Sequence, residues 1–128
     1  MGIMFSFPFL VEVDEAFAKE QYALVQKHLV GGFMGFKAIR EFPEGQDGRA
    51  DVDSGEIIMG FGQAASGFGL SAAAAMGDVS LQADLIRSKS LVLGSTSVAV
   101  DDKTREAILP LPGRCVILYG ESYPVAGE

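Results

Sequence analysis

The chain has 128 residues, of which 17 are acidic and 10 basic, so its formal net charge is −7 at pH 7. An acidic chain lacks the cationic surface that a phosphate backbone requires, which argues against nucleic-acid binding. The length fits a single domain over residues 1–128. Because 48% of the residues are hydrophobic and the mean hydropathy is +0.26, the chain can bury a core and is not intrinsically disordered.

Chemically reactive side chains are few. Cys115 is the one cysteine and His28 the one histidine, so the chain can form neither an internal disulfide nor a paired Cys or His metal motif. Cys115 lies in an apolar run and is expected to be a buried, inert thiol, which fits a reducing, cytoplasmic location. No metal and no cofactor is predicted.

The N-terminal residues 3–13 form a hydrophobic arm with no basic residue before it. We expect this arm to pack on the core or on a neighbouring subunit. The clearest helix follows over residues 14–30, where four apolar residues recur at helical spacing: Ala18, Tyr22, Val25 and Leu29. Glu15 and Lys19 form a supporting pair one turn apart, and Gly31 with Gly32 is expected to end the helix.

A long polar connection, residues 35–53, contains the candidate site. Asp51 and Asp53 are the candidate catalytic carboxylates, because paired carboxylates in a cleft can act as general acid and base. Four nearby charged residues are candidate ligand-binding groups: Arg40, Asp47, Arg49 and Glu56. The alternative is that the charges solvate a loop and that Asp53 and Glu56 cap the next helix.

A helical hairpin is predicted next, with one helix from Asp53 to Met76 and a second from Asp78 to Gly94. Gly77 ends the first helix and Asp78 caps the second. The first helix carries small residues about four apart, which would let other backbones approach closely. Residues 57–77 carry no charge, but glycine and alanine outnumber the strongly apolar residues, so a helix buried in protein is favoured over a membrane span.

A second interpretation of this region is a dinucleotide site. Gly60, Gly62 and Ala65 form a G-x-G-x-x-A string, in which glycines let a pyrophosphate approach a helix N-terminus. The sequence shows no strand–helix–strand alternation around the string, so a glycine-faced packing helix is preferred.

The last quarter of the chain changes character. Residues 98–109 are predicted to form a small C-terminal β hairpin around a charged turn. The run 114–119 fits either a strand or a short core helix, because periodicity does not distinguish the two. The predicted fold class is therefore mainly α, with helical hairpins, small-residue packing and a small C-terminal β hairpin.

The order of a helix, a long polar loop and a hairpin of small residues resembles part of an (α/α) toroid, as in six-hairpin glycosidases. The resemblance rests on residues 51–55, on Gly60-Phe-Gly62, on residues 65–68 and on Gly77-Asp78. It implies that Asp51 and Asp53 face a central funnel where such families hold sugars. A full toroid needs many more helices and a tryptophan platform, which this chain lacks, so it is read as a terminal fragment or as a domain that completes its core by oligomerising.

Two functions are expected from these observations. The first is a non-catalytic structural or self-assembly domain that forms a homo-oligomer through surplus apolar surface. The alternative is a toroid segment that binds or acts on a carbohydrate through Asp51 and Asp53. Membrane association is the least favoured reading.

Overall fold

The computed structural model describes residues 2–33, 35–46, 48, 57–58, 60–97 and 111–123. The elements, in chain order, are α1 (Gly2–Val13), α2 (Glu15–His28), β1 (Val30–Phe33), β2 (Phe36–Ile39), β3 (Ile57–Ile58), β4 (Phe61–Gly62), α3 (Gln63–Ala75), α4 (Val79–Ser97) and α6 (Leu111–Ser122). The fold is mainly helical with small antiparallel β hairpins, which confirms the predicted class. The C-terminal hairpin predicted at residues 98–109 lies outside the described residues.

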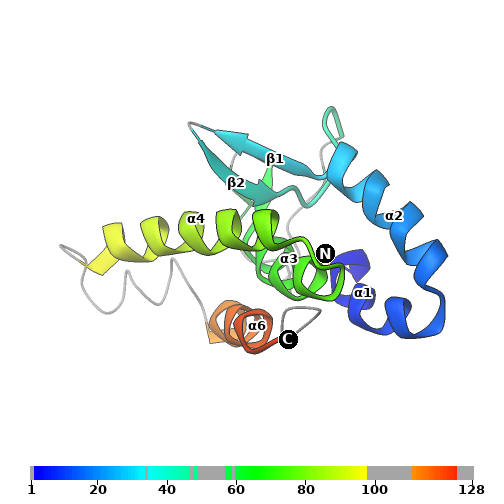
Figure 1. Cartoon of the computed structure of the whole chain (residues 1–128). Coiled ribbons are helices and arrows are strands. Elements are labelled where there is room, and N and C mark those ends of the chain that lie inside the picture. The colour runs from blue at the N-terminus through cyan, green and yellow to red at the C-terminus, as the bar shows by residue number, and fades with distance from the viewer. Residues whose placement is uncertain are drawn as a thin grey trace.

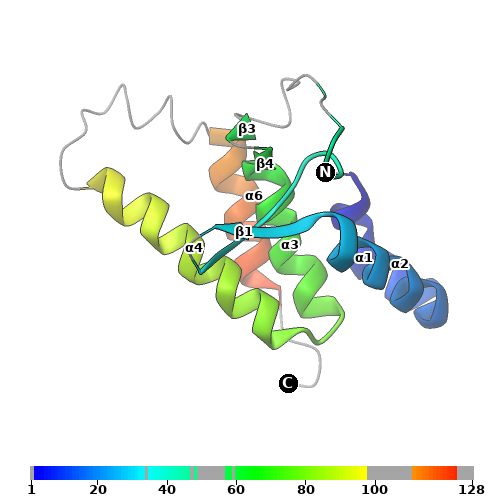
Figure 2. The ribbon, with the colours of Figure 1, turned by 90° about the horizontal axis from the view of Figure 1, so that it is seen from above.

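Helix α3 occupies the centre of the structure. In Figures 1 and 2 it lies among α1, α4 and α6, with the β1–β2 hairpin over one side. Most of its side chains are buried although they are small: Ala64, Ala65, Gly67, Gly69, Leu70, Ser71, Ala72, Ala73 and Ala74. A helix this poor in large side chains is stabilised mainly by close packing of its neighbours.

Two glycines show how close that packing is. A Cβ atom added at Gly69 would lie 2.8 Å from Cγ1 of Ile39 on β2. A Cβ atom added at Gly120 on α6 would overlap the carbonyl oxygen of Gly67 and lie 2.8 Å from Cβ of Leu70. The predicted small-residue packing is therefore confirmed, and it brings β2 and α6 against α3.

The junction between α3 and α4 is confirmed as a helical hairpin connection. Gly77 takes a left-handed conformation with φ of 69°, and Asp78 donates its N–H to the Ala73 carbonyl at 2.8 Å. This six-to-one bond is the usual C-terminal arrangement with glycine. Asp78 then caps α4 by accepting the Leu81 N–H at 3.0 Å.

The outer ends of this hairpin differ from the prediction. Helix α3 begins at Gln63 and not after Asp53, because Ile57–Ile58 pairs with Phe61–Gly62 around Gly60, whose φ is 84°. Two β-branched isoleucines followed by a left-handed glycine favour a tight turn over a helix. The predicted start of this helix at Asp53 is therefore wrong, whereas the capping box expected at Asp53 and Glu56 lies outside the described residues. Helix α4 continues past Gly94 to Ser97.

Helix α2 has the predicted apolar stripe, with Ala18, Tyr22 and Val25 buried. The Glu15–Lys19 ion pair is present at 2.6 Å between exposed side chains. The two glycines after the helix do not end it. The helix stops at His28, and Gly31 and Gly32 belong to β1, where they pair with Ala38 and Lys37 of β2.

The β1–β2 hairpin is held on α3 and α4 by two serine hydroxyls. Because Lys37 and Ile39 direct their N–H groups away from β1, both need another acceptor. Ser88 of α4 accepts the Lys37 N–H at 3.0 Å, and Ser66 of α3 accepts the Ile39 N–H at 3.0 Å. Ile39 is fully buried between them.

The two ends of the chain are both helical. The arm predicted at residues 3–13 forms α1, which buries Met4, Phe7 and Pro8. The run 114–119 belongs to α6, which resolves the choice between strand and helix in favour of helix. Cys115 is exposed, so the expectation of a buried thiol is wrong: the run is helical, and Cys115 falls on its outer side.

We predict that Gly120→Ala lowers the free energy of unfolding by about 1–3 kcal/mol, because the added methyl group forces α6 away from α3. Gly2→Ala is the matched control, since a Cβ atom there meets nothing within 4 Å. Urea unfolding followed by circular dichroism measures both. Equal stability of the two variants would contradict the close α3–α6 approach.

Candidate functional site

Arg40 is the one predicted site residue that lies among the described residues. Asp51, Asp53, Asp47, Arg49 and Glu56 lie outside them, so their grouping with Arg40 stays a prediction. The toroid resemblance and a carbohydrate ligand also stay predictions.

The Arg40 side chain joins two parts of the fold. Arg40 directly follows β2, and its backbone N–H donates a hydrogen bond to the Leu29 carbonyl at 2.7 Å. Its guanidinium carbon lies 4.9 Å from the centre of the Phe61 ring, which is within cation–π range. Its ion pair with Glu44 is long, at 3.7 Å, and Glu44 is exposed. The geometry therefore assigns Arg40 a structural contact between β2 and β4.

Glu41 decides against the dinucleotide interpretation. Its carboxylate lies at the N-terminus of α3, where a Cβ atom at Gly62 would stand 2.5 Å from Oε2. The position that a pyrophosphate would take at a helix N-terminus thus holds a carboxylate of the chain itself. The G-x-G-x-x-A string forms an antiparallel turn and a helix start, and the strands described here pair only antiparallel.

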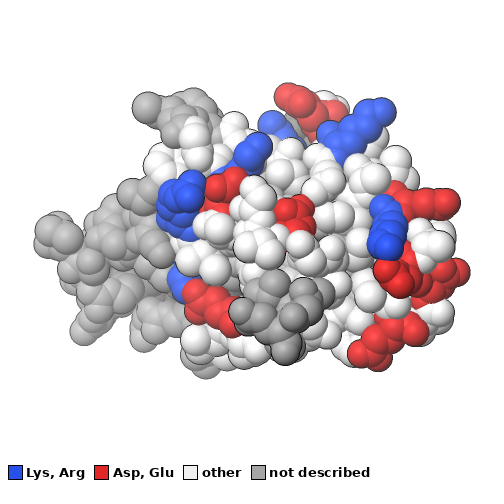
Figure 3. Space-filling model, in the orientation of Figure 1, with Lys and Arg blue, Asp and Glu red and all other residues white. Residues whose placement is uncertain are grey.

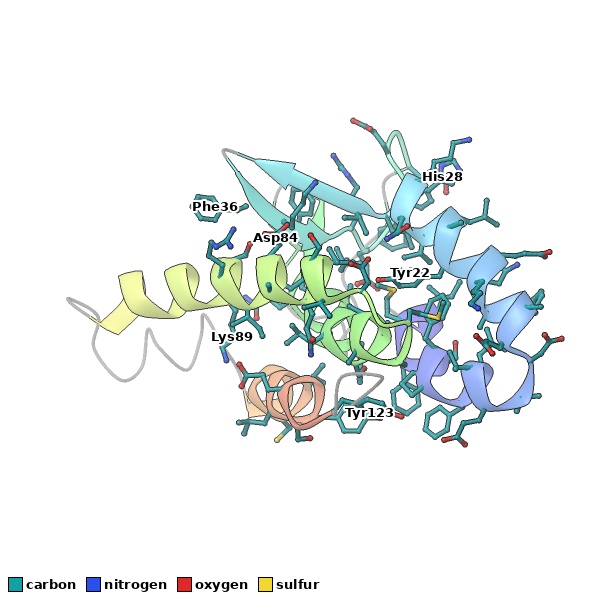
Figure 4. The ribbon with its side chains drawn as sticks, in the orientation of Figure 1. Tyr22, His28, Phe36, Asp84, Lys89 and Tyr123 are labelled. Carbon is teal, nitrogen blue, oxygen red and sulfur yellow. The ribbon has the colours of Figure 1, made fainter. Side chains whose placement is uncertain are left out.

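Asp78 is the centre of a polar contact between α2 and the α3–α4 junction. Its Oδ2 accepts a hydrogen bond from the Tyr22 hydroxyl at 3.1 Å and another from Nε2 of Gln26 at 2.7 Å. Its Oδ1 accepts the Leu81 N–H. Figure 4 shows Tyr22 on the side of α2 that faces this junction. The carboxylate thus ties α2 to the first turn of α4 and has few acceptor positions left for a substrate.

The contact with Asp78 changes the acidity of the Tyr22 hydroxyl. Burial, reinforced by the charge of Asp78 and by the hydrogen bond to it, raises the pKa of Tyr22 well above its ordinary value. A phenol held neutral in this way donates a stable hydrogen bond. Its partners and its burial indicate a structural role.

Five aromatic rings from α1, α3 and the C-terminal end of α6 form a connected cluster, which we call the aromatic surface: Phe5, Phe9, Phe68, Tyr119 and Tyr123. The ring centres of Phe5 and Phe68 are 5.1 Å apart, and those of Tyr119 and Tyr123 are 6.0 Å apart. Several of these pairs meet edge to face, the arrangement that aromatic quadrupoles favour.

The aromatic surface is open to solvent on the α1 side. Phe5 and Phe9 are exposed, and so is Leu118 of α6, which precedes Tyr119 in the sequence. Partial desolvation raises the pKa of Tyr123, and electrostatic interaction with the nearby Tyr119 and Glu12 raises it further. Figure 4 places Tyr123 at the edge of α6. The sequence analysis missed this surface, although the four-residue spacings Phe5–Phe9 and Tyr119–Tyr123 are a detectable helical signal.

Charge is distributed unevenly around this surface. Figure 3 shows acidic side chains gathered at the end of the molecule where α1 meets α2. The charged residues of that end are Glu12, Asp14, Glu15, Lys19 and Glu20. Helix α1 carries one charged side chain, Glu12, in its last turn. The aromatic surface is thus an apolar area beside an acidic one.

Among the described residues, no three His, Cys, Asp or Glu side chains are placed to hold a metal ion. Within the same residues, none of the helices combines the length and the apolar character needed to cross a membrane. Comparisons of the chain with protein-family models, with curated proteins and with solved structures find no match.

We predict that the stability of the wild-type chain falls as the pH rises above about 10, where the unfolded state releases the Tyr22 proton and the folded state retains it. Below that pH the contribution of Tyr22 is fully present. Tyr22→Phe should lower the unfolding free energy at neutral pH by about 1 kcal/mol, because it removes one hydrogen bond. It should also flatten the alkaline decline relative to the wild type.

Chemical denaturation at a series of pH values measures both effects. Tyr119→Phe is the control, because its ring packs against Phe5, Phe68 and Tyr123 and not against Asp78. An equally steep alkaline decline in wild type and Tyr22→Phe would contradict the role of Tyr22.

Proposed function

We propose that the chain is a non-catalytic helical domain that associates with copies of itself through the aromatic surface and the open side of α1. The observation that carries this proposal is the composition of α1. Its sequence, GIMFSFPFLVEV, is apolar around the whole circumference, yet the fold covers only the side that bears Met4, Phe7 and Pro8. Ile3, Phe5, Phe9 and Val13 are exposed.

A helix that is apolar on every side is normally buried on every side. Large contiguous apolar areas on a folded domain mark places where another surface docks. Aromatic side chains supply much of the affinity in such contacts, since they bury a large area with few rotatable bonds. These properties support association through α1, and they give no support to a chemical reaction there.

A copy of this chain is a suitable partner because the surface offers apolar area and few charges. Glu12 is the one charge on α1, so docking two copies buries little charge. Twofold association uses the same patch on both copies, which needs no second kind of surface. Strong repulsion between chains of charge −7 is reduced by salt, so we expect association to strengthen with ionic strength.

We predict that the chain is a dimer or a larger species at micromolar concentration and that Phe9→Glu weakens its association at least about tenfold, because it buries an unpaired charge. Sedimentation equilibrium over a concentration series gives the dissociation constants. Val79→Glu is the matched control. Val79 is 58% exposed at the start of α4, where an acidic residue is favoured in a helix.

A wild-type chain that stays monomeric throughout the micromolar range would refute the proposal. Equal weakening by Phe9→Glu and Val79→Glu would show that charge, and not the α1 surface, controls association.

A further inference from the structure

A single residue separates α1 from α2. Asp14 has φ of −154° and ψ of 92°, which breaks the helix, and its side chain accepts the Phe17 N–H at 3.0 Å. Its backbone nevertheless makes helical hydrogen bonds in both directions. Its N–H is donated to Leu10 at 2.8 Å, and its carbonyl accepts the Ala18 N–H at 2.9 Å. Rotation about this one residue is therefore enough to join the two helices.

The buried sides of α1 and α2 are in phase across Asp14. At about 100° per residue, the buried residues of both helices fall within an arc of about 100° on one continuous helix. These residues are Met4, Phe7, Pro8, Ala18, Tyr22 and Val25. Two independent helices joined by a turn have no need to share this phase, whereas one long helix does.

A second stripe exists only if the two helices are joined. Phe9, Val13, Phe17 and Leu24 are 54%, 83%, 46% and 50% exposed. On a continuous helix they share an arc of about 80°, well away from the buried stripe. Glu20 is the one charged residue between them in that arc. In the structure described here the bend at Asp14 divides this stripe, so no neighbour can cover it along its length.

We propose that α1 and α2 join into one helix over residues 2–28 and that α1 is exchanged with a second copy of the chain. This inference rests on the proposed self-association and specifies how it occurs. The joined helix is about 40 Å long. Its first half occupies the place of α1 on the partner, so Phe5 packs against Phe68 of the partner subunit and the Met4–Phe7 side is buried as before.

The exchange forms again, between copies, the contacts that α1 makes in the monomer, including the edge-to-face pair of Phe7 with Tyr22. The stripe of Phe9, Val13, Phe17 and Leu24 becomes continuous on the opposite side of the joined helix. A connection of one residue favours exchange, since short hinges are typical of exchanged elements. Exchange of an identical element also needs few contacts that the monomer lacks.

Two substitutions at the hinge separate the bent and joined states. Asp14→Ala removes the cap of α2 and favours a helix through the joint, whereas Asp14→Gly retains much of the cap and disfavours that helix. We expect the dimer of Asp14→Ala to be roughly tenfold or more tighter than that of Asp14→Gly. Sedimentation equilibrium compares them. Equal dissociation constants would overturn the exchange.

Cross-linking locates α1 directly. With Cys115→Ser, the double variant Phe5→Cys, Phe68→Cys is treated with a short bis-maleimide after isolation of its dimer by size exclusion. Exchange predicts a covalent dimer on a denaturing gel. An internally cross-linked monomer from an isolated dimer would overturn the exchange and leave self-association standing. A chain that is monomeric in every variant would overturn both proposals, and if the cysteines weaken the dimer, the Asp14 pair decides.

Discussion

Close approach to the backbone of α3 is the constraint on which the other elements depend. Helix α6 reaches it at Gly67 and Gly120, and β2 reaches it at Gly69, where Ile39 fills the space that a side chain would take. The two glycines within α3, Gly67 and Gly69, lower its intrinsic stability. Here the loss is offset by dispersion contacts on all sides, so α3 is stable only when α1, α4, α6 and β2 are in place.

Polar contacts fix the direction of the elements around this centre. Asp78 caps α4 and receives Tyr22 and Gln26 of α2, so one carboxylate sets where α2 lies relative to the α3–α4 junction. Lys89 of α4 pairs with Glu121 of α6 on the other side of α4. Apolar packing brings the helices together, whereas these directional bonds select one arrangement among many.

Local signals predicted the parts of this fold that local chemistry determines. The α2 stripe, the Glu15–Lys19 pair and the Gly77–Asp78 junction depend on residues a few positions apart, and all three are confirmed. The helix predicted from Asp53 begins only at Gln63, because Ile57 pairs with Gly62 in a β hairpin. Placing Gly31 in a strand required its partner Ala38 and the serines of two distant helices, which no local pattern reports. Of the predicted site, the structure tests Arg40 alone, and its contact with Phe61 joins residues 21 positions apart.

The serine hydroxyls on β2 have a consequence for how copies of this chain can meet. A two-stranded ribbon ordinarily offers its outer N–H groups to any extended peptide, the first step of uncontrolled sheet growth. The hydroxyls of Ser88 and Ser66 replace the carbonyl acceptors that a third strand would supply, because each accepts one of the two outward N–H groups of β2. That edge of the ribbon is therefore closed to strand addition by another chain.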